Sequence, residues 1–212
     1  MCMPDLTLEI RRLPKPGKTF ELIEAVTNRF KSANRRGLVS AALTTPHNRD
    51  RDVVSALGIS GWDELEKLNN NVLSDPNIQK EQTDIEELCI KAPTIQVLNV
   101  IERGDHITSG ATQYMRRTFL SAKRGESSAL LDTLLEWRGI MPEGKRPTIQ
   151  RQMSGSIDLV RITAGYQSIG DMMDSAADIA SNPNYSKLRD NMNRLTVSVV
   201  GFNYKVVHVN LG

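Results

Sequence analysis

"SDPNIQK" (residues 74–80) and "SNPNYSK" (residues 181–187) are two versions of one loop, and this repetition decides the fold. Ser, Pro, Asn and Lys stand at the same places in both stretches. Pro76 and Pro183 are 107 residues apart, which is about half of the 212-residue chain. A period of this length is far too long for a solenoid, so it indicates duplication of a whole domain.

Further matches upstream of the loop support the duplication. Gly58 and Gly165 keep the 107-residue separation, and both occur in stretches that are typical of strands. Nearer the start of each copy, Arg11-Arg12 aligns with Arg116-Arg117 at a separation of 105. The sequence therefore predicts two domains of similar length, residues 1–104 and 105–212.

Both copies show the same order of elements. Apolar residues alternate with polar ones in the strands and recur at helical spacing in the helices. For the first copy we predict a strand over 6–13, a helix from Thr19 to Gly37, strands over 38–45 and 53–60, a helix over 61–75 ended by Pro76, and a strand over 83–90 that 94–101 extends or crosses. For the second we predict strands over 112–120, 147–154, 157–166 and 195–209, with helices over 127–140 and 169–181.

This order, βαββαβ in each copy, predicts an α+β fold of two ferredoxin-like units. Each unit has a four-stranded antiparallel sheet with its helices on one face, so the other face must be covered. Two such sheets that pack face to face cover each other. We therefore expect one chain to complete an α+β barrel by itself, which leaves another surface for any further homo-oligomerisation.

Composition places the chain among ordinary globular proteins. Lys and Arg number 27 and Asp and Glu 25, and this balance argues against nucleic acid as a partner. No apolar run approaches the length of a membrane span, and the N-terminus does not resemble a signal peptide. The two cysteines, Cys2 and Cys89, are typical of reduced thiols, so we expect a cytoplasmic protein.

The organisation resembles the dimeric α+β barrel superfamily, and within it the NIPSNAP-like and antibiotic-biosynthesis-monooxygenase-like families. The first strand is followed by "PKPGK" (14–18), Trp62 opens the second helix and "SDP" (74–76) ends it. The resemblance implies small-molecule chemistry, as in cofactor-independent monooxygenases, haem-degrading enzymes and small isomerases. Haem degraders and quinone-forming monooxygenases use an Asn in the first strand with a Trp and often a His on a helix. Neither first strand here contains Asn, which argues against that chemistry.

Six side chains are candidates for binding a ligand. Glu9 and Arg11 alternate with Leu8 and Ile10, and are expected on the sheet face opposite the helices. The candidates are Glu9, Arg11, Tyr114, Arg116, Arg161 and His208. The arginines could bind a carboxylate or an enolate, and His208 has a suitable pKa for a base. The alternative is a structural ion-pair network between the sheets. We favour the second copy, since Glu9 would neutralise Arg11 in the first.

The same residues leave the question of an enzyme open. No nucleophilic triad, phosphate-binding loop or metal-ligand spacing occurs in the sequence, so no catalytic residue, metal or cofactor is assigned. The sequence favours a protein that binds a small apolar or acidic metabolite. The alternative is a cofactor-independent monooxygenase or isomerase of the α+β barrel type.

Overall fold

The computed structural model describes residues 5–42, 51–105 and 111–211, and the chain forms two compact units. Unit 1 contains residues up to Asn99 together with Val206–Gly212, and unit 2 contains Val100–Lys205. Two strands therefore pass from one unit into the other, β4 (Thr94–Glu102) and β8 (Thr196–Asn210). Cys2 lies outside the described residues, and Cys89 is a buried free thiol.

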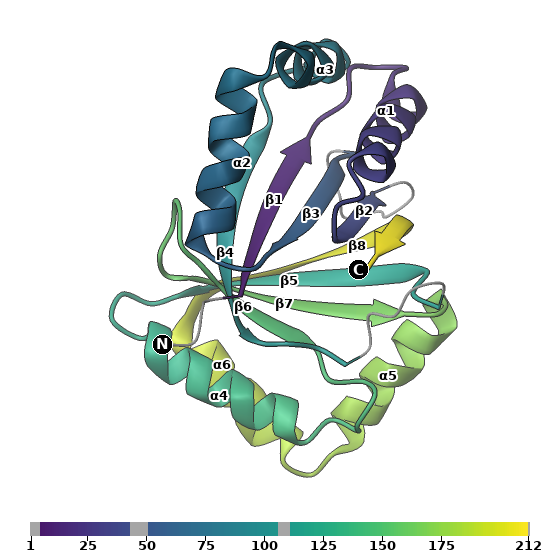
Figure 1. Ribbon diagram of the computed structural model, residues 1–212. Coiled ribbons are helices and arrows are strands. Elements are labelled where there is room, and N and C mark those ends of the chain that lie inside the picture. Colours follow the sequence, from purple (N-terminus) through teal and green to yellow (C-terminus); the bar gives the residue numbers. More distant parts are fainter. Residues whose placement is uncertain (1–4, 43–50, 106–110, 212) are drawn as a thin grey trace. The chain divides into compact units, whose positions relative to one another are not determined.

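Unit 1 is a four-stranded antiparallel sheet with three helices on one face (Figure 1). The strands follow the order β4-β1-β3-β2. The remaining elements are β1 (Leu6–Arg12), β2 (Gly37–Ala41), β3 (Val53–Ile59), α1 (Thr19–Ser32), α2 (Trp62–Ser74) and α3 (Pro76–Glu86). Its core joins Leu22, Val26 and Phe30 of α1 to Val39 and Val53 of the sheet.

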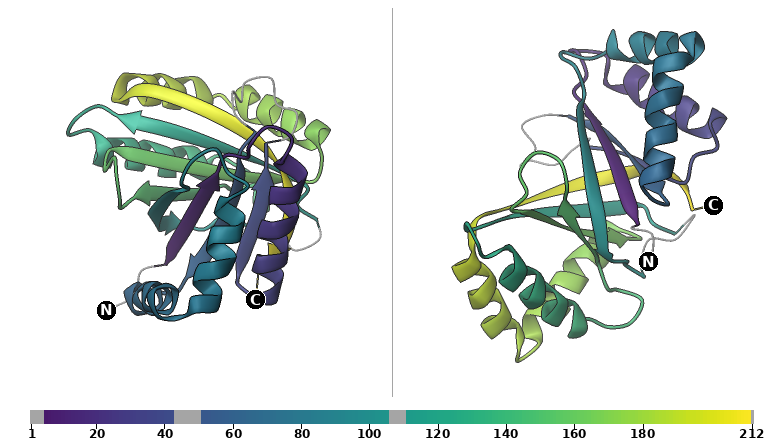
Figure 2. Two further views of the ribbon diagram at one scale, coloured as in Figure 1. Left: turned by 90° about the horizontal axis from the view of Figure 1, so that it is seen from above. Right: turned by 60° about the vertical axis from the view of Figure 1, so that its left-hand side comes forward.

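Unit 2 repeats this plan, again with all its helices on one face of the sheet (Figure 2). The strand order is β6-β7-β5-β8, the same ferredoxin-like order as in unit 1. The elements are β5 (Tyr114–Ala122), β6 (Thr148–Gln152), β7 (Leu159–Tyr166), α4 (Ser127–Gly139), α5 (Ile169–Ser181) and α6 (Tyr185–Leu195). Leu130 and Leu134 of α4 pack on Leu120, Ile149 and Val160 of the sheet.

The predicted fold class is confirmed. Both copies are ferredoxin-like units, and the hydrogen-bonded order of the eight strands closes as a barrel: β1-β3-β2-β8-β5-β7-β6-β4. The face-to-face packing of the two sheets stays a prediction, as does a domain boundary between residues 104 and 105. No helix in the described part of the chain is both long and apolar enough to cross a membrane.

The repeated loop joins a helix to a second helix, which corrects the predicted strand over 83–90. The Asp75 carboxylate accepts hydrogen bonds from the backbone N–H groups of Asn77 (2.8 Å) and Ile78 (3.4 Å), and Pro76 occupies the first turn. Asp at the N-cap followed by Pro is a helix start. In unit 2 the Asn182 side chain accepts from the Asn184 N–H at 3.0 Å just before α6 begins. The prediction treated Pro only as the end of a helix.

The turn after the first strand shows how the two copies align. Gly17 and Gly125 both have a positive φ, +79° and +86°, and they are 108 residues apart. Two residues before each glycine, the backbone N–H groups of Lys15 and Lys123 each donate to a leucine carbonyl near the end of the same copy, at 2.8 Å. These matched turns fix the alignment of the first strands at a separation of 108.

The alignment of Arg11-Arg12 with Arg116-Arg117 is therefore wrong by three residues. At a separation of 108, Arg12 aligns with Leu120. Because successive strand residues point to opposite faces, an odd shift exchanges the faces of the sheet. Arg116 lies on the helix-covered face of its sheet, whereas Arg11 lies on the other face of its own, so the two arginines do not occupy matching places.

Candidate functional site

A cavity of about 290 Å³ lies in unit 2 between the helix-covered face of the sheet and helices α4, α5 and α6. We call it the unit 2 cavity. Most of its wall is apolar, and none of the described residues that line it is Asp or Glu. Its lining includes Arg116, Leu120, Trp137, Met141, Ile162, Tyr166, Met172, Ile179, Tyr185, Arg189 and Met192. Its size is close to the lower end of the range for small-molecule sites.

Three residues that carry hydrogen-bond donors line this apolar space. The Arg116 guanidinium lies against the backbone of β8, since a Cβ added at Gly201 would be 3.1 Å from Arg116 Nη2. Trp137 Nε1 is buried and has no hydrogen-bond partner among the described residues. Burial raises the pKa of the Tyr166 phenol, an effect that the nearby Arg116 charge opposes. Tyr166 is therefore a neutral donor at physiological pH.

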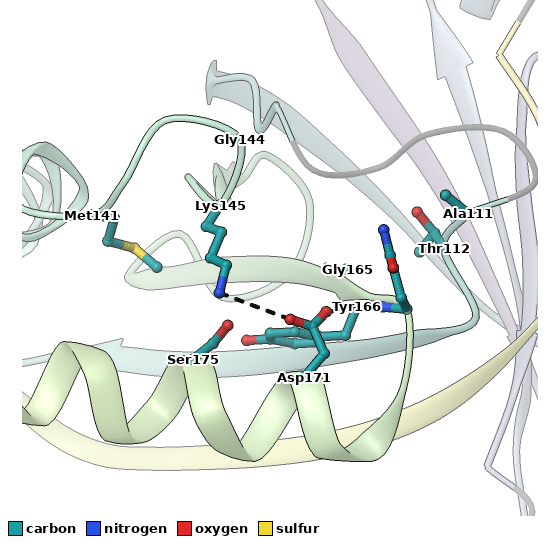
Figure 3. Close-up of a pocket in the computed structure, with 10 residues that line it drawn as sticks. Ala111, Thr112, Met141, Gly144, Lys145, Gly165, Tyr166, Asp171 and Ser175 are labelled. Atoms are coloured by element: carbon teal, nitrogen blue, oxygen red, sulfur yellow. Dashed lines mark hydrogen bonds and ion pairs between the residues drawn. The ribbon is translucent and has the colours of Figure 1, made fainter.

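A smaller polar pocket of about 200 Å³ adjoins this cavity, and Met141 and Tyr166 line both (Figure 3). Lys145 points toward α5, with Nζ 3.9 Å from a carboxylate oxygen of Asp171. Asp171 in turn accepts from the Gln167 N–H at 3.0 Å, which holds it at the start of α5. The Ser175 hydroxyl is buried in the same pocket and has no hydrogen-bond partner in the described chain. The apolar unit 2 cavity is therefore adjacent to a polar pocket.

A comparable cavity of about 460 Å³ lies in unit 1, between its sheet and helices α1, α2 and α3. We call it the unit 1 cavity. Leu8, Ile10 and Arg12 line it from β1, which places Glu9 and Arg11 on the opposite face, as predicted. Arg12 was not among the predicted site residues.

Of the predicted residues, Arg116 alone lines one of these cavities. Tyr114 is two residues away on the same strand face, and Lys205 Nζ lies 4.4 Å from the centre of its ring. In the opposite face of the unit 2 sheet, Arg161 donates from Nε and Nη2 to Gln150 Oε1, at 2.9 and 2.7 Å. This paired arrangement favours a structural role for Arg161 within its own sheet.

The two predicted residues of the first strand are also outside the cavities. Glu9 is buried at 4% exposure, next to Ala56 and Gln96 on the neighbouring strands. Arg11 forms an ion pair with the buried Asp52. Neutralisation of Arg11 by Glu9 stays a prediction, and Asp52 supplies a carboxylate to Arg11 in the structure.

His208 lies on β8, in the part of that strand that belongs to unit 1. Its ring meets the Phe30 ring edge-on, with 5.7 Å between the ring centres. Burial, and secondarily the charge of Lys31, lowers the pKa of His208. These contacts indicate that His208 packs as a neutral ring on the core of unit 1.

This environment predicts a pH dependence of stability. Because the folded pKa of His208 lies below its ordinary value, the unfolded chain takes up the proton first as the pH falls. Neutral His208 therefore contributes to folding stability above the ordinary pKa of histidine, and this contribution is lost as the pH falls below it. Between about pH 7.5 and about pH 5.5 we expect His208→Phe to show a shallower fall in urea midpoint than the natural protein. His47 and His106, outside the described residues, are kept in both proteins; identical slopes would contradict the prediction.

Comparison with known proteins identifies the fold. No protein-family model and no curated protein sequence matches the chain. Among solved structures it is similar to a "putative monooxygenase" from Fusobacterium nucleatum, with a TM-score of 0.72 and 10% identity over 98% of this chain and 94% of the other. It is also similar to a "putative monooxygenase" from Lactobacillus acidophilus, with a TM-score of 0.68 and 8% identity over 99% and 97%. A third similar structure is an "anthrone oxidase-like protein". It has a TM-score of 0.61 and 15% identity over 97% of this chain and 92% of the other.

These likenesses span nearly the full length of both chains, so the duplication is part of the shared architecture. The chain has the tandem ferredoxin-like α+β barrel fold that its sequence resembles. Identities of this size show the fold alone, since one fold carries many functions.

Trp137 and Tyr166 were missed as candidate ligand contacts. A tryptophan on a helix is more often a packing residue than a ligand contact, and the burial of the Trp137 indole N–H gave no sequence signal. Tyr166 ends β7 and comes next to Arg116 only through the pairing of β5 with β7. Arg12 did carry a signal, because strand alternation puts it on the same face as Leu8 and Ile10.

Proposed function

We propose that unit 2 binds a small apolar molecule bearing an acidic or carbonyl oxygen, in the unit 2 cavity. The observation that carries this proposal is the buried Trp137 N–H, which has no acceptor among the described residues and belongs to a side chain that lines an apolar cavity. A buried donor without an acceptor is costly, and a ligand oxygen would satisfy it.

The other donors suit the same ligand. Arg116 would add a charge-assisted hydrogen bond, which is about twice as strong as a neutral one. Tyr166, whose pKa is raised by burial, would donate from its neutral phenol. Ile162, Met172 and other apolar side chains would contact the body of the ligand. The absence of Asp and Glu from the described lining favours a ligand that accepts hydrogen bonds over a cationic one.

The test uses the chain's two tryptophans. In a Trp62→Phe background, Trp137 is the single fluorescent reporter, and 2-naphthoate and 2-acetylnaphthalene are titrated against the full chain. We expect saturable quenching by both probes. Arg116→Gln should weaken 2-naphthoate binding about tenfold, the equivalent of one charge-assisted hydrogen bond. It should affect the neutral ketone less.

Arg124→Gln is the matched control, because Arg124 is exposed in the same unit and lines neither cavity. It should bind both probes as the parent does. Equal weakening by Arg116→Gln and Arg124→Gln, or no quenching by either probe, would refute the proposal. The alternative is a cofactor-independent monooxygenase. To test it, a molecule that is recovered bound to the native protein is supplied in excess. A monooxygenase would then consume O₂ and form an oxygenated product.

A further inference from the structure

The unit 1 cavity differs from the unit 2 cavity in having a buried charge in its apolar wall. Leu8 and Ile10 of β1, Val26 and Phe30 of α1, and Ile85 of α3 line it. Arg12 projects from the end of β1 into the same space and is only 7% exposed. Burying an arginine so completely is unusual unless the charge is paired.

The described chain does not supply that pairing. Arg12 Nη1 donates to the Ser55 hydroxyl at 3.1 Å, whereas Nε is buried and has no acceptor. No carboxylate among the described residues forms an ion pair with it. Glu86 lines the cavity but is solvent-exposed, and Arg29, also in the lining, is paired with Glu81. Desolvation by burial is the main reason that the pKa of Arg12 is lowered to about 10.

The duplication shows that the fold does not require this arginine. The residue of unit 2 that aligns with Arg12 is Leu120, which is buried in the core of its own unit. The same strand position can therefore be filled by an apolar side chain. Unit 1 instead keeps a desolvated guanidinium beside a cavity of about 460 Å³, a volume within the range of small-molecule sites.

Helix α2 leaves room for a ligand. It has no buried residue, although Leu68 and Val72 line the cavity and are half-buried. A molecule in the cavity would cover both side chains and bury apolar surface on α2. The helix therefore forms an outer wall that is packed less tightly than α1 and α3.

We propose that the unit 1 cavity is a second, separate site that binds an apolar carboxylate, with the carboxylate on Arg12 and Ser55. The body of the molecule, an aromatic system or an acyl chain, lies among Val26, Phe30 and Ile85. Arg12 Nε and the Ser55 hydroxyl would give the carboxylate two donors. This site is independent of the proposed function of unit 2, because the two cavities share no described residue.

The test follows isoleucine methyl groups by NMR in the full chain, so that each cavity has its own reporters. Ile10, Ile78 and Ile85 report on unit 1, and Ile162 and Ile179 report on unit 2. The probes are 2-naphthoate, its neutral counterpart 2-naphthamide, and decanoate. We expect 2-naphthoate or decanoate to shift the unit 1 methyls saturably in the millimolar range or below, with 2-naphthamide binding there much more weakly.

Arg12→Met should weaken carboxylate binding in unit 1 about 100-fold and change 2-naphthamide binding little, since a charge-assisted pair in a desolvated site is lost. Arg12→Lys keeps the charge without the two-pronged donor geometry and should give an intermediate loss. Arg116→Met is the matched control and should leave the unit 1 shifts unchanged. An Arg12→Met protein that binds carboxylates like the natural chain would overturn the proposal, as would unit 1 methyls that no carboxylate shifts. Loss of shifts in unit 2 alone would bear only on the proposed function of that unit.

Discussion

Gly37→Ala is expected to disrupt unit 1. Gly37 begins β2 with φ +140°, and a Cβ at this position would clash with the carbonyl oxygen of Ala56. That oxygen belongs to β3, the strand that pairs with β2, so it cannot withdraw without breaking the sheet. The clash adds to the strain of a backbone conformation that L-residues avoid. We therefore expect the free energy of unfolding to fall by about 3 kcal/mol or more. Urea unfolding followed by circular dichroism measures it.

Gly125→Ala separates the clash from the backbone strain. Gly125 also has a positive φ, +86°, but a Cβ there would meet no atom within 4 Å. This variant should therefore cost only about 1–2 kcal/mol. If the two variants unfold at the same urea concentration, the predicted clash between a side chain at position 37 and the backbone of β3 is wrong.

Arg12→Met is expected to make the ligand-free protein more stable. The natural side chain is desolvated on the helix-covered face of β1, and this burial lowers its pKa to about 10. Methionine has a similar length and fills the same space without a charge. Replacing buried charges with apolar residues commonly stabilises a protein by about 1–4 kcal/mol, and we expect about 2 kcal/mol here. For a chain of this size that corresponds to a rise of roughly 4–8 °C in Tm.

Arg12→Met also has a destabilising effect. The substitution removes the hydrogen bond from Arg12 Nη1 to Ser55 and leaves the buried Ser55 hydroxyl without this donor. The double variant Arg12→Met/Ser55→Ala removes that cost, about 1 kcal/mol, and should be the more stable of the two. A fall in Tm for both variants would show that Arg12 supports the fold. A rise shows that the fold tolerates Arg12 at a cost in stability, as binding residues often require.

The repeated Ser-Pro-Asn-Lys loop was sufficient to predict the duplication, and local alternation was sufficient to predict most strands. Leu8 and Ile10 alternate with Glu9 and Arg11 in β1, and the structure has them on opposite faces as expected. The second helix of each copy was predicted as single because Pro was interpreted only as a terminator. The Asp75-Pro76 pair carried the missing helix start, so this error lay in the interpretation of a signal that the sequence contains.

The alignment of the copies shows a different limit. Arg-Arg occurs near the start of both copies, and identity of sequence suggested that the pairs match. The turns at Gly17 and Gly125 set another register, in which Arg12 aligns with Leu120. Two arginines that look equivalent along the chain therefore face different surroundings. A strand's faces alternate at every residue, so an alignment error of three residues reverses the assignment of face.

The sequence by itself determined the number of copies, the type of most elements and the alternation of polar and apolar residues along the strands, because these depend on residue spacing and on short-range caps and turns. Only the tertiary structure decided which polar side chains lie beside cavities. Trp137 and Tyr166 come together through the packing of α4 on the sheet and the pairing of β5 with β7. Arg12 is desolvated in a cavity whose lining also comes from α1 and α3, which are distant from each other in the sequence. Burial is a property of what packs over a residue, and local sequence does not contain it.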